Sequence, residues 1–344
     1  MAVSQESSTS RGRRPQETKL VICVRNSFSL WNPPPEFAEG IRTRWPEMRV
    51  LHLPNSDGLG RELAEADIFV GYSMRPQQLA QARKLKWIHT VSTGVTQLMY
   101  PELRQSGIEV TNASSVHCVP MAQHILGVLI ALARRFPDCF RFQQQCRWAQ
   151  QELWNAPVRP REMRGQVLLL IGFGSIGREV ARLVGPLGMH IWAVTRSGRG
   201  DPGLAEKNLP PSRLHEVLPE ADFVVVAAPE TPETRGMIGA REFGMMKSTA
   251  YFVNVARGGI ADEAALIAAL EQRAIAGGAL DVTSSEPLPP DSPLWKLDNV
   301  FLTPHVSAVT EHAWKRQEEL VAENLERWFS GCELLNRVDL RRGY

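Results

Sequence analysis

The strongest constraint on the fold is a short apolar run that breaks into three closely spaced glycines. Residues 167–171 read Val-Leu-Leu-Leu-Ile and lead into Gly172-x-Gly174-x-x-Gly177, after which residues 178–187 have helical composition. A strand without polar residues is typical of a parallel sheet that is covered on both faces. A strand, a glycine turn and a helix in this order predict the phosphate cradle of a dinucleotide-binding unit.

Each glycine has its own task in such a cradle. Gly172 permits the tight turn, Gly174 lets the pyrophosphate of the cofactor approach the backbone, and Gly177 lets the helix pack close to its strand. The start of the helix, with Ser175 and Ile176, presents N–H groups and the positive end of the helix dipole to the phosphates. An ordinary glycine-rich turn can have the same spacing, so the motif needs support from the rest of the chain.

Composition excludes several other classes of protein. The chain has 344 residues, of which 43% are hydrophobic and 22% charged, which fits a soluble protein of about two domains. The net charge of +2 gives no argument for a nucleic-acid or membrane partner. The five cysteines lack metal-type spacing, which argues against a metal site or a disulfide framework and favours a reducing, cytoplasmic compartment.

The N-terminal residues 1–18 are polar and lack the apolar core of a secretory signal. We interpret them as a disordered leader. A transit peptide is the alternative, and Glu6 and Glu17 count against it.

Short apolar runs alternate with helical segments along most of the chain, which predicts an α/β fold with two doubly wound parallel-sheet domains. The larger is expected to be a Rossmann dinucleotide-binding domain over residues 113–309. The smaller is expected to be a flavodoxin-like substrate domain over residues 19–112 and 310–344. Strands are predicted at residues 20–24, 49–53, 68–71, 87–91 and 108–111, and at 167–171, 190–194, 223–227, 250–255, 278–281 and 300–302.

Two further segments are predicted outside these sheets. Residues 116–147 form the longest helical stretch, followed by an aromatic-rich extended arm that reaches residue 160. The arm is either a dimer contact near residues 135–160 or a loop packed on its own domain. Residues 310–329 are predicted to form one amphipathic helix that returns to the first domain.

The residues after the second strand of the larger domain indicate which dinucleotide binds. An acidic residue commonly contacts the adenosine ribose at this position, but the chain reads Thr195-Arg196-Ser197. A carboxylate would repel a 2′-phosphate, whereas these three side chains can donate hydrogen bonds to it. We therefore predict NADP(H) as the preferred cofactor with NAD(H) as the alternative, in which Asp201 would bind the ribose.

Three polar residues follow later strands of the larger domain, at the edge where α/β sheets bind their ligands. Arg257 follows residues 251–256, Glu286 follows the strand near 278–281, and His305 follows the strand near 300–302. Taken singly, each could be an ordinary loop residue.

Together with the cradle, these residues resemble the D-isomer-specific 2-hydroxyacid dehydrogenase family, of the glyoxylate/hydroxypyruvate reductase type. The resemblance covers about residues 68–310. It is carried by Pro229-x-Thr-Pro-Glu-Thr234, Asn254-Val-Ala256-Arg257-Gly, Ala-Leu-Asp281-Val…Glu286-Pro and Thr303-Pro-His305, and in the first domain by Ser92-Thr93-Gly94-Val and Val110-Thr-Asn112.

The resemblance implies NAD(P)H-dependent reduction of a small 2-oxo acid to a D-2-hydroxy acid by a homodimeric enzyme. Arg257 would bind the substrate, and His305 would be the general acid and base, paired with Glu286; this matches the cation and the proton donor that the reaction needs. By the same resemblance, Thr93 and Gly94 would hold the substrate carboxylate through main-chain N–H groups. Pro229, Thr234, Ala256 and Asp281 would contact the cofactor, with Asp281 at its nicotinamide end.

An interaction protein is the alternative function. Corepressors related to this family keep the fold and use nucleotide binding to control assembly, and they can retain the same three polar residues. An activity assay beside a His305→Ala variant separates the two functions.

Overall fold

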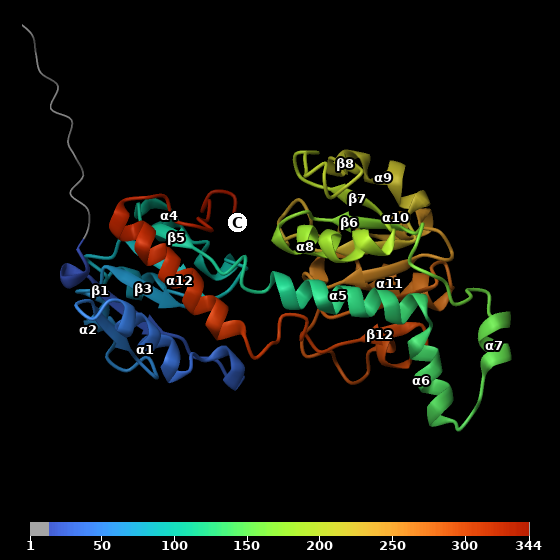
Figure 1. Ribbon diagram of the computed structural model, residues 1–344, viewed down its shortest axis with the longest axis horizontal. Helices are drawn as coiled ribbons and strands as arrows, with labels where there is room; N and C mark the ends of the chain where they lie inside the picture. Colours follow the sequence, from blue (N-terminus) through green and yellow to red (C-terminus); the bar gives the residue numbers. More distant parts are fainter. Residues whose placement is uncertain (1–13, 344) are drawn as a thin grey trace, which may run out of the picture. The chain divides into compact units, whose positions relative to one another are not determined.

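The computed structural model describes residues 14–343, which divide into two α/β units, each with its own parallel sheet (Figure 1). One unit holds residues 14–117 and 310–343, and the other holds residues 118–309. From the sequence alone, the divisions were predicted after residues 112 and 309. Within residues 14–343, no helix is both long and apolar enough to cross a membrane.

The first unit has a five-stranded sheet in the order β2-β1-β3-β4-β5, with every pairing parallel. This is the flavodoxin-like order, as predicted. The strands are β1 (Lys19–Cys23), β2 (Arg49–His52), β3 (Ile68–Gly71), β4 (Trp87–Thr90) and β5 (Glu109–Thr111). The helices are α1 (Pro35–Arg44), α2 (Leu59–Leu63), α3 (Pro76–Leu79), α4 (Pro101–Gln105) and α12 (Ala313–Ser330), with 3-10 helices η1 (Pro15–Glu17), η2 (Ser29–Trp31) and η3 (Thr96–Leu98).

Both faces of this sheet are buried because successive strand residues point to opposite sides. Leu20 and Ile22 pack with α1 and α12 on one face, whereas Val21 packs with α2 and α4 on the other. Figure 1 shows α12, far along the chain, lying beside α1 over this sheet.

A chain of buried polar side chains links β4 and β5 to α12. His89 is fully buried, its Nδ1 lies 2.8 Å from Thr111 Oγ1, and its Nε2 contacts the amide of Gln317. Trp87 Nε1 donates to the same Thr111 hydroxyl at 2.8 Å. Burial disfavours the charged ring and lowers the pKa of His89 to about 3.

Most of the predicted leader, residues 1–13, lies outside the described residues. The remainder is folded: η1 covers Pro15–Glu17, and Thr18 is buried and donates from Oγ1 to Arg14 O at 2.8 Å. Residues 15–18 are therefore part of the folded first unit, which differs from the prediction of a disordered leader over residues 1–18.

The second unit has a seven-stranded parallel sheet in the order β12-β11-β10-β9-β6-β7-β8. From the cradle strand β6 the order reverses, which is the arrangement of a Rossmann fold and confirms the predicted class. The strands are β6 (Val167–Ile171), β7 (His190–Val194), β8 (Lys207–Leu209), β9 (Phe223–Val226), β10 (Tyr251–Asn254), β11 (Gly277–Leu280) and β12 (Val300–Leu302). The sequence analysis missed β8, which is three residues long and buries only Leu209, so it has no apolar run.

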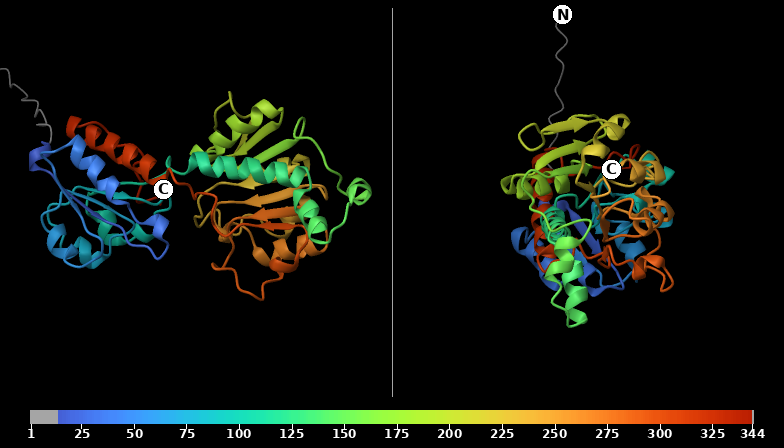
Figure 2. Two further views of the ribbon diagram at one scale, coloured as in Figure 1. Left: turned by 60° about the horizontal axis from the view of Figure 1, so that its bottom comes forward. Right: turned by 90° about the vertical axis from the view of Figure 1, so that its right-hand side faces the viewer.

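Helices cover both faces of this second sheet. Leu169 and Ile171 of β6 belong to one buried cluster, and Leu168 and Leu170 to another that includes α5 and α8 (Figures 1 and 2). The helices are α5 (Cys118–Ala133), α6 (Phe136–Gln144), α7 (Gln150–Asn155), α8 (Ser175–Val184), α9 (Leu214–Val217), α10 (Ala240–Met245) and α11 (Glu263–Glu271), with 3-10 helices η4 (Gly185–Leu187), η5 (Pro211–Arg213), η6 (Leu218–Glu220), η7 (Gly258–Ile260) and η8 (Pro293–Lys296).

The predicted helical stretch 116–147 is two helices. α5 ends at Ala133, Arg135 takes a left-handed conformation with φ 60°, and α6 starts at Phe136. Pro137 explains the break, because its ring lacks an N–H and would clash with the Ala133 carbonyl in a continuous helix. The predicted extended arm is also wrong in part, since α7 forms within it. Figure 2 shows α6 and α7 standing away from the sheet.

Candidate active site

The glycine cradle joins β6 to α8, and steric contacts require glycine at two of its three positions. Gly172 has φ 100°, and a Cβ there would lie 2.6 Å from Ala228 N. A Cβ on Gly177 would lie 2.5 Å from Gly172 O, whereas one on Gly174 would meet nothing within 4 Å. The backbone at Gly174 is therefore open to a ligand, which is what an approaching pyrophosphate requires.

The helix after the cradle begins earlier than predicted. α8 starts at Ser175, so Ser175, Ile176 and Gly177 form its first turn and Gly174 caps it. N–H groups of a first turn have no partner within the helix, and they carry the positive end of its dipole. The open Gly174 and these N–H groups fit a bound dinucleotide phosphate.

The loop after β7 contains the residues predicted to select the cofactor. Thr195 Oγ1 donates to Arg199 O at 2.8 Å, so the Thr195 hydroxyl proton is used inside the loop rather than being free for a phosphate. Ser197 Oγ accepts from Arg199 N at 3.3 Å and keeps its own proton for donation. Asp201 Oδ1 accepts from Gly203 N at 2.9 Å, so this carboxylate caps the next turn.

Three further residues of the predicted cofactor site follow β9, which pairs with β6, and β10, which pairs with β9. Thr234 Oγ1 donates to Pro229 O at 2.7 Å and closes the turn after β9. Ala256, after β10, is buried, and its N–H donates to Asn254 Oδ1 at 3.0 Å. The parallel strands bring these residues to the carboxyl edge where the cradle lies.

Glu286 and His305 are brought together at the same edge. Glu286 Oε2 lies 2.6 Å from His305 Nδ1, and Glu286 Oε1 accepts from Thr283 N at 3.2 Å. The two side chains keep 38% and 45% of their surface exposed, respectively, so the pair stays accessible to a small molecule. Because Nδ1 faces the carboxylate, Nε2 is the ring nitrogen left to exchange a proton.

Asp281 holds the loop that carries His305. Its Oδ1 accepts from Thr303 Oγ1 at 2.6 Å and from Val306 N at 2.9 Å, and its Oδ2 accepts from Ser307 N at 3.0 Å. The backbone of His305 itself has a left-handed conformation, with φ 52°. Burial opposes ionisation of Asp281, but hydrogen bonds from Ser307 and Thr303 and from backbone N–H groups outweigh it and lower the pKa of this carboxyl.

This role of Asp281 is one that the sequence analysis did not assign. A carboxylate has about four acceptor positions, and on Asp281 the side chains of Thr303 and Ser307 and the main-chain N–H groups of Val306 and Ser307 donate to them. The sequence feature that could have indicated this role is an acidic residue directly after the buried strand β11.

Arg257 follows β10, and its side chain is exposed. Its Nη1 donates to Ala256 O at 2.6 Å, and Asn254 Nδ2 donates to Arg257 O at 3.0 Å. The next residue, Gly258, packs against the turn before Glu286, because a Cβ on Gly258 would lie 2.0 Å from Thr283 O. The backbone of the Arg257 loop is thus in direct contact with the backbone of the Glu286 loop.

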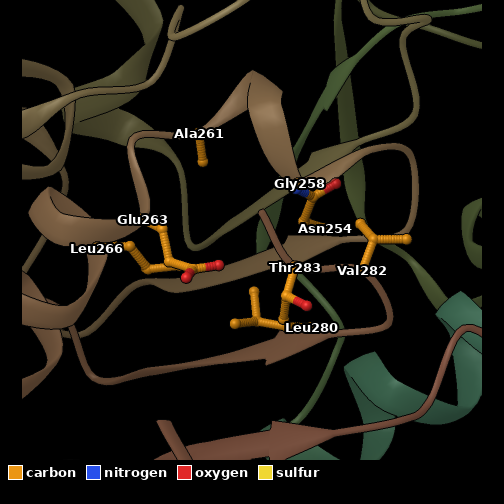
Figure 3. A pocket seen from close by; sticks show the side chains of 8 residues that line it. All are labelled: Asn254, Gly258, Ala261, Glu263, Leu266, Leu280, Val282 and Thr283. Carbon is orange, nitrogen blue, oxygen red and sulfur yellow. The ribbon is translucent and has the colours of Figure 1, made fainter. Parts of the chain in front are cut away.

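A small pocket lies between these two loops (Figure 3). It is lined by Asn254, Gly258, Ala261, Glu263, Leu266, Leu280, Val282 and Thr283. Its volume of about 10 Å³ corresponds to one water molecule and is too small for a substrate. Asn254 and Glu263 are further functional candidates that were not predicted from the sequence. Their contacts depend on which loops the fold brings together.

The predicted substrate residues Thr93 and Gly94 belong to the first unit, after the end of β4. Asn112 Nδ2 donates to Thr93 O at 2.9 Å, and Gln97 Nε2 donates to Gly94 O at 3.2 Å. Within residues 14–343, no hydrogen bond uses the main-chain N–H groups of Thr93 and Gly94.

Known proteins match this chain over most of its length. The family model for the NAD binding domain of D-isomer specific 2-hydroxyacid dehydrogenase matches residues 126–307. The chain is 37% identical over 254 residues to the glyoxylate reductase of Thermococcus gammatolerans, covering 73% of this chain and 75% of that protein. It is 34% identical over 264 residues to the D-3-phosphoglycerate dehydrogenase of Archaeoglobus fulgidus, covering 75% of this chain but only 48% of that relative.

A solved structure matches the whole fold. It is a D-isomer specific 2-hydroxyacid dehydrogenase from Xanthobacter autotrophicus Py2 in complex with NADPH and MES, with a TM-score of 0.82 and 29% identity, covering 95% of this chain and 100% of that chain. The Rossmann sheet and these matches define an NAD(P)-binding oxidoreductase. The chain belongs to the D-isomer specific 2-hydroxyacid dehydrogenase family, which confirms the resemblance seen in its motifs.

Proposed function

We propose that this protein reduces a small 2-oxo acid, of the glyoxylate or hydroxypyruvate type, to the D-2-hydroxy acid with NADPH, and catalyses the reverse reaction. The observation that carries the proposal is the 2.6 Å contact between Glu286 and His305 at the sheet edge that also holds the glycine cradle. Relatives named glyoxylate reductase support the substrate class.

His305 is the proposed general acid and base. In the direction of reduction, its protonated Nε2 donates a proton to the substrate carbonyl oxygen while Nδ1–H stays bonded to Glu286. The carboxylate stabilises the positive imidazolium and keeps Nε2 directed away from itself. In the reverse direction, the neutral Nε2 accepts the proton of the substrate hydroxyl.

Arg257 is the proposed substrate cation. Its exposed guanidinium can bind the carboxylate and the carbonyl oxygen in a forked geometry. The open main-chain N–H groups of Thr93 and Gly94 are proposed as further donors to the substrate carboxylate.

The residues of the cradle fit a dinucleotide. Gly174 and the first turn of α8 would hold its pyrophosphate, Pro229, Thr234 and Ala256 would line its path, and Asp281 would lie at its nicotinamide end. When bound, the nicotinamide supplies a hydride to the carbonyl carbon. NADPH is the proposed partner because Arg196 and Ser197 suit a 2′-phosphate, while Asp201 is engaged in its own turn.

Homodimer formation through the segment 135–160 is part of the proposal. The exposed large side chains Phe136, Phe140, Trp148 and Trp154 lie on or between α6 and α7, and 93% of Trp148 is accessible. A second copy of the chain is the proposed cover for them. Analytical ultracentrifugation should give a dimer mass for the parent chain, and Trp148→Glu should lower it toward the monomer mass.

The test of the function is a panel of 2-oxo acids assayed with NADPH and NADH. We expect turnover of glyoxylate and hydroxypyruvate with a D product and a higher kcat/KM for NADPH. His305→Asn should abolish turnover and retain cofactor binding. If the parent chain binds NADPH but reduces none of glyoxylate, hydroxypyruvate, phenylpyruvate and branched 2-oxo acids, the proposal is wrong.

The cofactor preference has its own variant. Arg196→Ala should lower the ratio of kcat/KM for NADPH to that for NADH about tenfold, the effect of losing one strong charged hydrogen bond. Arg182→Ala, an exposed arginine of α8 whose partner is Glu179, is the matched control and should leave the ratio unchanged.

A further inference from the structure

The turn that carries Glu286 is held by a second carboxylate, Glu263. Glu263 is the first residue of α11, whose start is capped by Asp262 Oδ1, the acceptor of Ala265 N at 3.1 Å. From there, Glu263 Oε2 accepts the main-chain N–H of Ser284 at 2.8 Å. Figure 3 shows the Glu263 side chain pointing from the α11 side of the pocket toward Thr283.

The residues on either side of Ser284 lead directly to Glu286. Thr283 N–H donates to Glu286 Oε1 at 3.2 Å, and Thr283 Oγ1 donates to Ser285 O at 2.7 Å. The turn is therefore a small network in which Glu286 is tied to the Thr283 backbone, and that backbone is tied to α11 through Ser284. Glu286 Oε2, the oxygen not used in this network, is the one that contacts His305 Nδ1.

Gly258 limits how this turn can move. The peptide between Thr283 and Ser284 lies where a Gly258 side chain would be, with Thr283 O and Ser284 N 2.0 Å and 2.4 Å from the position of its Cβ. The turn cannot shift toward the Arg257 loop, and a hydrogen bond from Ser284 N opposes movement in the other direction. The Glu263 carboxylate accepts that hydrogen bond.

We propose that Glu263 is a positioning residue: by binding the Ser284 N–H, it fixes the turn that places the Glu286 carboxylate on Nδ1 of His305. The description of this pair as catalytic rests on the proposed function. The geometric claim, that Glu263 controls the contact between Glu286 and His305, can be tested on the protein without any turnover.

The test follows the hydrogen bond of His305 by NMR in the full chain labelled with 15N at histidine, with the signals assigned by His305→Asn. In the neutral ring, the Glu286 carboxylate accepts from Nδ1 and favours the tautomer with its proton on Nδ1, whose population the two ring 15N shifts report. Glu286→Gln should lower that population about twofold, because a neutral amide oxygen is a weaker acceptor than a carboxylate. Glu263→Ala should lower it to a similar extent. Glu263→Asp keeps the charge but is too short to reach Ser284 N, and should do the same.

Glu263→Gln is the informative rescue, because an amide oxygen still accepts the Ser284 N–H, so the tautomer population of His305 should stay at the parent value. Glu271→Ala, an exposed glutamate at the other end of α11, is the control for charge and should have no effect. In the Glu286→Gln background, Glu263→Ala should lower the population no further, since the two residues act in series.

Several outcomes would overturn the inference. One is an unchanged tautomer population of His305 in both Glu263→Ala and Glu263→Asp while Glu286→Gln lowers it. Another is an equal change of that population in Glu263→Gln and Glu263→Ala, which would make the effect one of charge rather than of the hydrogen bond. Failure of the proposed function is distinct: the NMR shifts would appear as expected, but no 2-oxo acid would be reduced.

Discussion

Substitutions at two glycines of the cradle should affect different properties. Gly177→Ala should lower the stability of the free protein, whereas Gly174→Ala should weaken NADPH binding. In Gly177→Ala, the new methyl group would lie 2.5 Å from Gly172 O, a backbone atom that cannot rotate away. Because an ordinary contact of this kind is 3.4 Å or more, α8 would have to move from β6 by about 1 Å, against the packing of Val180 and Val184 in the core. In Gly174→Ala, the methyl group would meet no protein atom within 4 Å.

The magnitude for Gly177→Ala follows from two opposing terms. Overpacking of a well-packed core costs about 1–3 kcal/mol, and a clash with a backbone atom, which cannot rotate away, falls in the upper part of that range, at about 2–3 kcal/mol. Replacing glycine by alanine in a helix returns about 1 kcal/mol. The net loss is about 1–2 kcal/mol, and at about 2–4 °C per kcal/mol for a unit of this size, the Tm should fall by about 2–8 °C.

The assay is thermal unfolding by circular dichroism, with and without NADPH, together with calorimetric titration of NADPH. Gly177→Ala should lower the Tm of the free protein. Gly174→Ala should leave the Tm of the free protein within about 1 °C, but NADPH affinity should fall about tenfold or more, which is about 1.4 kcal/mol. The rise in Tm that saturating NADPH produces should shrink accordingly. An unchanged Tm in Gly177→Ala, or unchanged NADPH affinity in Gly174→Ala, would refute the steric reasoning.

Three other predictions concern single side chains. Glu286→Gln should lower kcat/KM for reduction at least about tenfold at unchanged Tm, because the imidazolium of His305 loses its carboxylate partner; full activity would contradict the proposed pairing. Arg257→Lys should lower kcat/KM at least about tenfold at unchanged Tm, because an ammonium cannot form the forked contact; full activity would remove Arg257 from the mechanism. His89 is neutral in the folded state, because burial lowers its pKa to about 3 from an unfolded value near 6.5. Its burial therefore leaves the free energy of unfolding unchanged above pH 6.5 and lowers it by about 2 kcal/mol at pH 5. In urea unfolding, the loss of stability toward acid pH should be less steep in His89→Gln than in the parent, and an equal slope would contradict this assignment.

Much of the fold could be predicted because its determinants are local. The apolar runs, such as residues 167–171, have the length and composition of strands buried on both faces. Helical segments between them indicate a parallel sheet whose two faces are covered by helices. The break at Pro137 also has a local cause, since proline cannot continue a helix, but the prediction of one helical stretch over residues 116–147 missed it. β8 could not be predicted, because a three-residue strand at the edge of a sheet is stabilised by its pairing with β7 rather than by its own residues.

The pairing of Glu286 with His305 was expected from the family resemblance alone; the other contacts inside the candidate site were not expected, because they depend on register between segments far apart in the chain. Leu280 of β11 pairs with Leu302 of β12, which sets the following loops side by side and brings Asp281 to Thr303 and Glu286 to His305. The same holds for the Glu263 contact, whose two residues are 21 positions apart.

The sequence by itself determined which residue types stand at the strand ends and where the backbone must be glycine, since chain direction and steric bulk act over a few residues. Only the tertiary structure decided which oxygen of Glu286 contacts His305 and which backbone groups hold the two loops. Hydrogen bonds act over about 3 Å, and whether two groups come that close is decided by the packing of the whole sheet.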